Sequence, residues 1–567
     1  METREDLNSI LPFLPLVIRS SALFWPSQVV EALRLLSQGP DCSNVNSGES
    51  LFVALSDIRN SLSLSAEPLA PHAQEGYALF FDELITRAKS AKWFREVLPA
   101  LANFLLKLPS LLESHYENAD NWLNRDSNNV KIGLRLLGPQ EAGIVFLSQE
   151  LIGALLACAF FCLFPITDRR IEDLPMINFD HLFESLYASY SEKQENKIKC
   201  IVNYFERISA SPPVGFVSFE RKVLPLGKFH ECISYPKSDF WNESKTPLCP
   251  LEVHDCGFIE DQSSGALEVD FANKYLGGGA LHRGCVQEEI RFMINPELIA
   301  GMLFLPCMED NEAVEIVGSE RFSNYIGYAS SFRFSGDHVD KRDIHSFGRR
   351  KTRIVAIDAL CSPGMRQYKP NYLLREINKA FCGFLDQSKF DHYKRLCQDS
   401  KHQAVQCKLN YEDISHESAN NFMLNEGPSA SVDVEMHEAE CTNEVAGEFS
   451  KGSCLLFHED KIPIATGNWG CGAFGGDPEI KSIIQWLAAS QALRPSILYY
   501  TFGISALQSL DKVSQWIRSH EWSVGDLWNM LVEYSQQRFN RETNVGFFTW
   551  LTPSLINCET ATPNTPP

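Results

Sequence analysis

The chain has 567 residues, enough for about three or four packing units of roughly 150 residues each. Hydrophobic residues make up 44% and charged residues 22% of the sequence, a balance that excludes a disordered or fibrous chain. The formal net charge is −21, so the molecule as a whole repels polyanions, and we expect no direct binding to duplex DNA or RNA.

The first part of the chain, residues 1–210, is predicted to be an all-helical domain. Apolar residues recur three and four positions apart in Gln28–Leu36, Tyr77–Leu112 and His181–Ile208, as on one face of a helix. The most apolar stretch, Leu151–Pro165, is shorter than the about 20 residues that a membrane-spanning helix needs. We therefore expect a buried core helix there and no contact with a membrane.

Residues 211–555 are predicted to form a second domain, of the α/β class. Short apolar runs alternate with amphipathic segments, which favours a central parallel or mixed sheet with helices on both faces. The predicted strands are Leu267–Phe271, Val314–Val317, Ile354–Ala359, Ser453–Phe457 and Ile497–Phe502. The predicted helices are Val286–Leu303, Tyr372–Leu385, Glu479–Leu493, Ala506–Ile517 and Val524–Phe539.

An acidic segment interrupts the second domain. Residues 411–450 contain ten Asp or Glu residues and no Lys or Arg, which predicts a disordered, solvated insertion. The alternative is a regulatory segment that competes with an anionic ligand. Residues 556–567 are predicted to be a flexible C-terminal tail.

A glycine-rich turn could hold phosphate. Residues Gly470–Gly475 fit G-x-G-x-x-G between strand-like residues and a predicted helix, as in a dinucleotide-binding turn. No acid follows the next predicted strand, at Tyr500–Gly503, to bind ribose hydroxyls, so a nicotinamide-dependent oxidoreductase is a weak alternative. Backbone N–H groups at a helix start can bind phosphate without that acid; the structural alternative is a tight turn without a ligand.

A second glycine run precedes a pair of acids. Gly277-Gly278-Gly279 lies upstream of Gln287-Glu288-Glu289, which begins an amphipathic helix. Successive glycines let a backbone lie against a sugar or diphosphate. Neighbouring side chains on a helix diverge by about 100°, so one carboxyl should transfer a proton while the other orients substrate. The structural alternative is that both acids only stabilise the helix N-terminus.

The remaining candidates for ligand or metal binding are aromatic and cysteine residues. Tyr325–Tyr328, Phe474 and Phe502 lie at predicted loops, where flat rings can stack on a purine or ribose. Taken singly, each ring is better explained by packing in the core. Cys249, His254 and Cys256 lack a recognisable fourth ligand, so no metal site is predicted. The 17 cysteines are scattered singly, which is typical of a protein from a reducing compartment.

Five blocks of residues, in this order, resemble the poly(ADP-ribose) glycohydrolase family. The blocks are Val269–Asn273, the glycine triplet with Val286–Phe292, Gly327–Ala329, Val355–Leu360 and Ala465–Asp477. The resemblance implies a macrodomain-like three-layer α/β/α core with a mixed central sheet, preceded by an all-helical accessory domain. It also implies hydrolysis of the ribose–ribose O-glycosidic bonds of poly(ADP-ribose) to ADP-ribose, without a metal or other cofactor.

Site roles follow from the resemblance motif by motif. Glu289 would be the general acid and then the base, with Glu288 and Asp270 completing the acidic site; a neighbouring carboxylate and partial burial would favour the protonated form of Glu289. Residues 468–473 would hold the diphosphate, Phe474 would pack against ribose, and Tyr328 and Phe502 would hold adenine. The residues implied to bind substrate are Ile259, Glu260, Asn273, Gly277, Gly278, Gly279, Gln287, Tyr328, Asn468, Trp469, Gly470, Cys471, Gly472, Ala473, Phe474 and Phe502.

The resemblance also implies a biological setting. We expect a monomer that acts on poly(ADP-ribose) attached to acceptor proteins, in the nucleus and cytoplasm, as part of poly(ADP-ribose) catabolism and the DNA damage response. The alternative function is a non-catalytic macrodomain reader of ADP-ribose. Glu289 distinguishes the two, because a reader has no need of a proton donor at that position.

Deletion of Glu412–Ser450 tests the predicted insertion. We expect the deleted protein to fold with an unchanged melting temperature, because the segment has too few apolar residues to contribute to a core. Thermal unfolding of both proteins measures this, and a large drop in melting temperature would show that the segment is packed.

Overall fold

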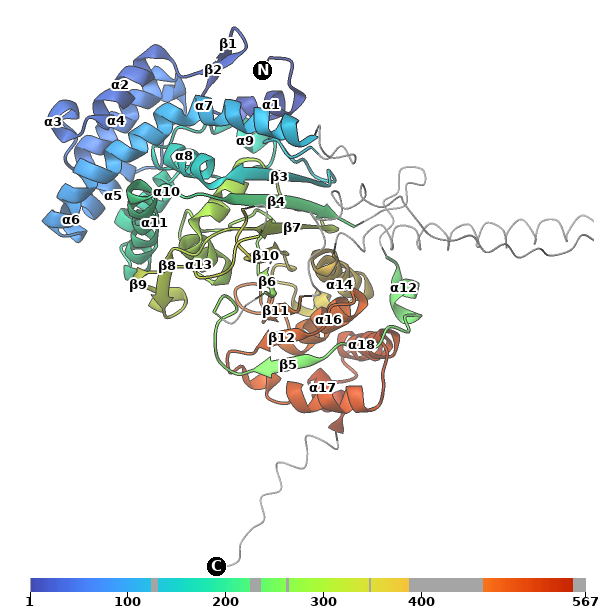
Figure 1. Cartoon of the computed structure of the whole chain (residues 1–567). Helices are drawn as coiled ribbons and strands as arrows, with labels where there is room; N and C mark the ends of the chain where they lie inside the picture. The colour runs from blue at the N-terminus through green and yellow to red at the C-terminus, as the bar shows by residue number, and fades with distance from the viewer. Residues whose placement is uncertain are drawn as a thin grey trace, which may run out of the picture.

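The computed structural model describes residues 2–123, 131–224, 236–261, 265–345, 348–386 and 462–553. In Figure 1 the helical N-terminal part, in blue, and the C-terminal part, in yellow to red, lie on either side of one long sheet. The acidic segment 411–450, the predicted strand Ser453–Phe457 and the predicted tail 556–567 lie outside the described residues.

The N-terminal part is built mainly from helices, as predicted. They are α1 (Glu5–Ile10), α2 (Ser27–Ser37), α3 (Pro40–Ser43), α4 (Gly48–Ser61), α5 (Ala73–Ala78), α6 (Arg87–Lys92), α7 (Leu98–Leu123), α8 (Gln149–Phe160), α9 (Thr167–Ile171), α10 (Asp180–Ala188) and α11 (Glu192–Ala210). Predicted segment Tyr77–Leu112 is interrupted, because Thr86 accepts a hydrogen bond from the Lys89 amide at 3.3 Å and so starts a new helix.

Helix α8 contains the most apolar stretch of the sequence. Its residues from Gln149 to Phe160 are nearly all buried, which confirms the predicted core helix. Among the described helices, none combines the length and the apolar character that crossing a membrane requires.

Three strands within the first 210 residues were not predicted from the sequence. β1 (Val17–Arg19) and β2 (Ala22–Phe24) form a hairpin, and β3 (Gly143–Ser148) pairs with β4 (Phe216–Val223) at the edge of the central sheet. The run in β3 is short, and its partner lies about seventy residues away, so periodicity alone does not distinguish it from a buried helix segment.

The central sheet has eight strands in the order β3-β4-β7-β10-β6-β11-β12-β5. Five neighbouring strands, from β10 to β5, run parallel, and the three at the other edge pair antiparallel, so the sheet is mixed, as expected. The remaining strands are β5 (Leu251–His254), β6 (Leu267–Asp270), β7 (Glu312–Val317), β10 (Arg353–Ala356), β11 (Ile464–Gly467) and β12 (Ile497–Tyr500), with β8 (Ser323–Ile326) and β9 (Arg333–Asp337) in a separate hairpin.

Helices cover both faces of the sheet and make three layers. Ile354 packs with the N-terminal helices, whereas its neighbour Val355 packs with the C-terminal helices, since successive strand residues point to opposite faces. The C-terminal helices on the Val355 face are α12 (Ser238–Asn242), α14 (Pro370–Phe384), α16 (Pro478–Gln491), α17 (Leu510–Ser519), α18 (Val524–Phe539) and α19 (Phe547–Leu551). Helix α13 (Gln287–Ile294) packs on the opposite face, with the N-terminal helices.

The predicted helix Val286–Leu303 is divided in two. After α13, a 3-10 segment covers Pro296–Leu303. Asn295 has φ −121° and ψ +71°, outside the helical region, because a residue before proline avoids the α conformation. The break leaves α13 as a short helix whose first turn carries both candidate acids.

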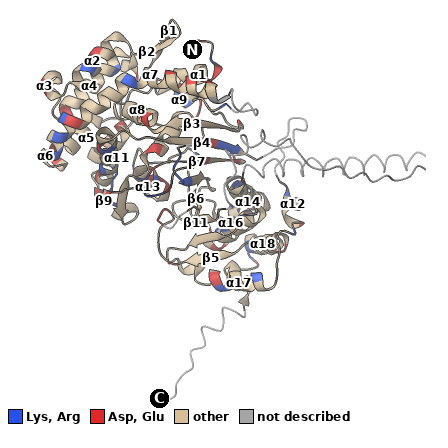
Figure 2. Ribbon diagram, viewed as in Figure 1, with Lys and Arg blue, Asp and Glu red and all other residues tan. Residues whose placement is uncertain are grey.

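Charged residues are distributed unevenly between the described part of the chain and the acidic segment. Removing the ten acids of residues 411–450 from the total of −21 leaves −11 for the rest of the sequence. On the described helices of the N-terminal part, acidic and basic residues are interspersed (Figure 2). Inside the sheet, Arg221 of β4 and Glu312 of β7 form an ion pair in which both side chains are fully buried.

The contribution of the buried Arg221–Glu312 ion pair to the stability of the sheet can be tested. We expect Arg221→Met to lower the free energy of unfolding by about 3–5 kcal/mol, because Glu312 would remain buried without its cation. The exposed pair of Lys107 and Glu150 supplies the control: Lys107→Met should change stability by less than about 1 kcal/mol. Denaturant unfolding measures both, and equal effects would contradict the structural role of the buried pair.

Candidate active site

A cavity of about 390 Å³ lies where several parallel strands end. Phe271 and Ala272 directly follow β6, Asn468 directly follows β11, and Phe502 follows β12, and all four line the cavity. Ligands of α/β proteins bind at this edge of a sheet, because the loops after parallel strands converge there. Of the residues predicted to bind substrate, those lining the cavity are Ile259, Glu260, Gln287, Tyr328, Asn468, Trp469, Gly470, Cys471, Gly472, Ala473, Phe474 and Phe502.

The turn after β11 offers unpaired amides to the cavity. Among the described residues, the backbone N–H groups of Gly472, Ala473 and Phe474 have no hydrogen-bond acceptor. Successive free amides in a turn are a binding site for an anion. The turn is well anchored, because the Trp469 indole donates to the Ile357 carbonyl at 2.8 Å and the Asn468 amide donates to the Thr501 carbonyl at 2.9 Å.

Close packing at this turn requires glycine. Gly470 has φ +73°, and a Cβ atom there would lie 2.5 Å from the Cβ of Ala359. Directly after the turn, Asp477 accepts a hydrogen bond from the Glu479 amide at 3.0 Å and caps α16. The glycine-rich motif therefore forms a tight strand-to-helix turn beside a cavity, as predicted.

Two aromatic residues stand at the mouth of the cavity. Tyr328 is 51% exposed and Phe502 45% exposed, which excludes the alternative that they are core residues. Burial of the Tyr328 hydroxyl and, to a smaller extent, the nearby charge of Glu289 raise the pKa of that hydroxyl.

Backbone amides hold both acids at the start of α13. Glu288 accepts from the amides of Asn273 and Gly277, at 2.8 and 2.7 Å. Glu289 accepts from the amides of Gly279 and Val286, at 3.0 and 2.8 Å. Each carboxylate thus receives two charge-assisted hydrogen bonds, which are about twice as strong as neutral ones.

The glycine triplet packs against these acids. Gly277 and Gly278 have φ +86° and +48°, and a Cβ at Gly278 would lie 2.5 Å from Glu288 and 2.9 Å from Glu289. The two carboxyl groups therefore converge on one glycine, although helix geometry alone led us to expect divergence. The reason is that Glu289 folds back to the amide before its own helix, while Glu288 turns towards the preceding loop. The triplet and Asn273 are not among the residues that line the cavity.

Asp270 completes a buried acidic cluster with Glu288 and Glu289. Neither oxygen of the Asp270 side chain has a hydrogen-bond partner among the described residues. Burial raises the pKa of Asp270 to about 7, with Arg291 lowering it and Glu289 raising it. Burial, Asp270 and Glu289 also raise the pKa of Glu288 well above its usual range. Two carboxyl groups of the cluster, those of Asp270 and Glu288, therefore have raised pKa values.

Exposure ranks the three acids. Glu289 is 8% exposed, Glu288 is 3% exposed and Asp270 is 1% exposed. Glu288 and Glu289 both lie between Gln287 and Ile290, which line the cavity, but none of the three predicted catalytic acids is itself among the lining residues. Glu289 is the most exposed acid of the cluster.

Two further predicted residues make structural contacts as well as lining the cavity. The Gln287 side chain accepts from the Phe271 amide at 2.8 Å and donates to the Val269 carbonyl at 3.1 Å, so it ties α13 to the end of β6. The Glu260 carboxylate accepts a hydrogen bond from the Tyr325 hydroxyl. These contacts fix the orientation of both side chains before any ligand binds.

Sequence reasoning assigned no role to several lining residues. They are Phe258, Phe271, Ala272, Val286, Ile290, Arg291, Ala359 and Ile504, whereas Tyr325, which also lines the cavity, was among the aromatic candidates. Arg291 forms an ion pair with Glu268 at 2.5 Å. Its position in the sequence, three residues after Glu288 and within Val286–Phe292, could have identified it as a residue of the site. Phe258 and Ile504 reach the cavity only through folding, and nothing in their local sequence identifies them.

The sequence predicts no metal site at Cys249, His254 and Cys256. Among the described residues, Cys249, His254 and Cys256 form no group with metal-binding spacing. A different set, His181, Glu184 and His282, does have such spacing.

The acidic cluster predicts a pH-dependent stability. Because the folded-state pKa of Asp270, about 7, exceeds its ordinary value of 3.8, the folded protein binds this proton more tightly, and stability is lost as pH rises from about 4 to about 7. Asp270→Asn removes this titration, so the variant should lose less stability between about pH 5 and pH 8, by at least about 1 kcal/mol. Denaturant unfolding at both pH values measures the difference, with Asp343→Asn, whose side chain is 81% exposed, as control.

Comparison with known proteins agrees with this geometry. The family model described as poly(ADP-ribose) glycohydrolase, macro domain fold, matches residues 238–509, and the model for the helical domain of the same family matches residues 85–221. The expected fold class, a macrodomain-like core preceded by a helical domain, is thereby confirmed. The predicted domain boundaries at residues 210 and 555 stay predictions.

Relatives match over nearly the whole chain. Poly(ADP-ribose) glycohydrolase 1 of Arabidopsis thaliana is 58% identical over 562 residues, which cover 99% of each chain. Probable poly(ADP-ribose) glycohydrolase 2 of the same plant is 53% identical over 98% of this chain and 100% of its own. Poly(ADP-ribose) glycohydrolase 1 of Caenorhabditis elegans is 30% identical over 59% of this chain and 35% of its own. The chain belongs to the poly(ADP-ribose) glycohydrolase family.

Proposed function

We propose that this protein hydrolyses the ribose–ribose O-glycosidic bonds of poly(ADP-ribose) and releases ADP-ribose, with Glu289 as the proton donor. Family membership supports the activity. The observation that supports the assignment of Glu289 is that it is the most exposed acid of a buried cluster on α13, the helix whose residues Gln287, Ile290 and Arg291 line the cavity beside the free amides of residues 472–474.

The chemistry explains why these features belong together. Cleavage of a ribosyl bond develops positive charge on the sugar and negative charge on the departing oxygen. Glu289 would protonate that oxygen and then, as a carboxylate, take a proton from the attacking water. The free amides of Gly472, Ala473 and Phe474 would hold the diphosphate, whose negative charge lies near the developing positive charge.

The remaining contacts orient the substrate. Phe474 would pack against ribose, and Tyr328 and Phe502 would hold adenine at the mouth, where both rings are about half exposed and offer flat apolar faces. Glu288 and Asp270 would keep a proton within the cluster near neutral pH, because burial and mutual repulsion raise the pKa of both. Ile259 and Glu260 line the same cavity.

A reader of ADP-ribose without catalytic activity is the weaker alternative. Burying three carboxyl groups beside a site for an anionic ligand opposes ligand binding, since like charges repel and desolvation adds a further penalty. A site that only binds ADP-ribose gains nothing from this arrangement. The acidic cluster therefore favours catalysis.

The biological setting is part of the same proposal. The substrate would be polymer attached to acceptor proteins, and the protein would act as a monomer in the nucleus and cytoplasm, in poly(ADP-ribose) catabolism after DNA damage. The eleven cysteines of the described residues are all free thiols, which fits a reducing compartment. The net charge of −21 does not favour direct binding to duplex DNA or RNA.

Glu289→Gln separates binding from catalysis. We expect ADP-ribose affinity to stay within about tenfold, or about 1.4 kcal/mol, because the amide keeps the shape of the carboxyl group. Turnover of labelled polymer should fall by at least about 10²-fold, the usual effect of losing a general acid. Calorimetry measures binding, and chromatography of released ADP-ribose measures turnover.

The control is Glu533→Gln, at an exposed position of α18, which should leave both quantities unchanged. Polymer turnover by Glu289→Gln near the wild-type rate would show that another group supplies the proton. A loss of both binding and turnover would assign Glu289 to substrate binding instead.

A further inference from the structure

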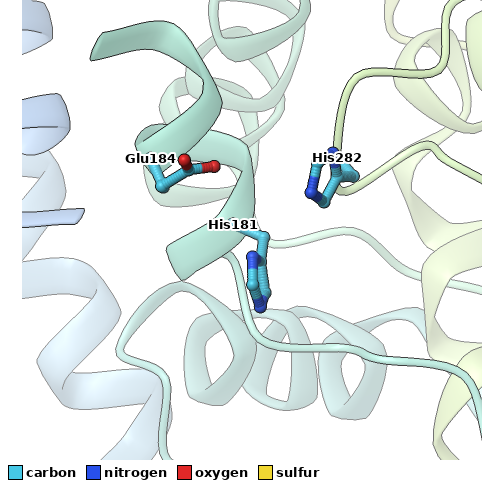
Figure 3. Close-up of side chains that lie close together, drawn as sticks. All are labelled: His181, Glu184 and His282. Carbon is cyan, nitrogen blue, oxygen red and sulfur yellow. The ribbon is translucent and has the colours of Figure 1, made fainter. Parts of the chain in front are cut away.

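Three potential metal ligands meet at a junction between the helical part and the glycine loop. His181 and Glu184 lie one turn apart on α10, and His282 lies in the loop between the glycine triplet and α13. One ligand atom from each residue lies within 4.8 Å of the others. Figure 3 shows Glu184 and His282 on facing segments, with His181 below them on the α10 side.

We propose that His181, Glu184 and His282 bind a divalent transition metal ion, with zinc as the best fit. Two imidazoles and one carboxylate form a ligand set that zinc accepts, whereas calcium and magnesium prefer oxygen ligands. Zinc–nitrogen and zinc–oxygen bonds of about 2.0–2.2 Å require the ligand atoms to approach one another by only a small movement of these side chains. Water would complete the coordination.

The main chain around His282 is already rigid. Its carbonyl accepts hydrogen bonds from Gln194 at 2.8 Å and Lys197 at 2.7 Å, both on α11, and its amide donates to the Gly279 carbonyl at 2.9 Å. The His282 side chain is exposed, and the rings of His181 and His282 stack with centroids 5.4 Å apart. A fixed backbone with free imidazoles keeps the cost of assembling the site low.

Neighbouring cationic side chains affect how tightly the three residues would bind a metal ion. Arg283 lies 3.8 Å from the Glu184 carboxylate, and its own side chain is 53% exposed, so it can move into solvent when a metal ion takes its place. Lys193 and Lys197 contact backbone carbonyls of the same loop and would still repel the ion. Either ring nitrogen of His282 can bind the metal, Nδ1 by replacing its hydrogen bond from the Arg283 amide and Nε2 by a change of tautomer.

The site would join two parts of the molecule. The same loop carries Gly279, whose amide holds Glu289, and Gly284, which lies against Glu289. An ion between α10 and His282 would therefore stabilise the loop that positions the acid. This inference does not depend on the role of Glu289 in catalysis, because it concerns metal binding itself.

The test is zinc binding to the full-length protein. After chelator treatment and alkylation of accessible thiols, which removes exposed Cys42, Cys256 and Cys361 as competing ligands, zinc chloride is titrated in a calorimeter. We expect one ion per chain, with affinity at least about tenfold lower in His282→Ala and in Glu184→Gln, since loss of a ligand should exceed the effect of losing a supporting contact. Arg283→Ala should bind zinc more tightly.

A matched control exists on α5. His72 and Glu75 form another exposed pair three residues apart, at 3.5 Å, and no third ligand joins them in the described part of the chain, so His72→Ala should leave zinc affinity unchanged. Zinc should also raise the melting temperature of the wild type and not that of His282→Ala, while the metal-free melting temperatures of the two should agree and so exclude misfolding. Wild-type affinity in His282→Ala, or no zinc binding by the wild type, would overturn the proposal.

Discussion

The active site depends on the capture of two neighbouring carboxylates by four backbone amides. Glu288 and Glu289 lie side by side at the first turn of α13, buried next to Asp270. Without hydrogen bonds, three such groups would repel one another and resist burial. The positive φ of Gly277 and Gly278 turns the backbone so that its amides reach the acids, and the missing side chains leave room for them. Holding the acids is therefore the first role of the triplet.

The helical part of the molecule contributes directly to this arrangement. Lys197 on α11 donates to the carbonyls of His282 and Gly284, at 2.7 and 2.6 Å. These bonds hold the loop between the glycine triplet and α13 from the side opposite the sheet. At the edge of the central sheet, β3 extends the sheet by pairing with β4. The N-terminal helices thus support the geometry of the acids, which gives a physical reason for the two parts to occur together in one chain.

In the proposed mechanism, the substrate diphosphate is bound by backbone dipoles. A protein with a net charge of −21 gains little from long-range attraction of a polyanionic substrate, but the free amides of Gly472, Ala473 and Phe474 act at short range inside a cavity. Amides that are already held in place need not reorient when an anion binds. They also stabilise negative charge more strongly in a cavity than in bulk water, because less solvent screens them. Arg291 lowers the pKa of Asp270, but burial outweighs it and the pKa of Asp270 is raised.

The sequence by itself determined the class of fold, most of the helices and half of the described strands after residue 250 (β6, β7, β10 and β12, but not β5, β8, β9 and β11), and the motifs around Asp270, Glu289 and Gly470, because periodicity and turn chemistry are local properties. Tertiary structure alone decided which acids carry the raised pKa values, since these depend on burial and on charges from β6 and α13 together. It also decided that β3 joins the sheet and that His181 meets His282, about one hundred residues away. Such contacts arise from the packing of distant segments, and no local pattern encodes them.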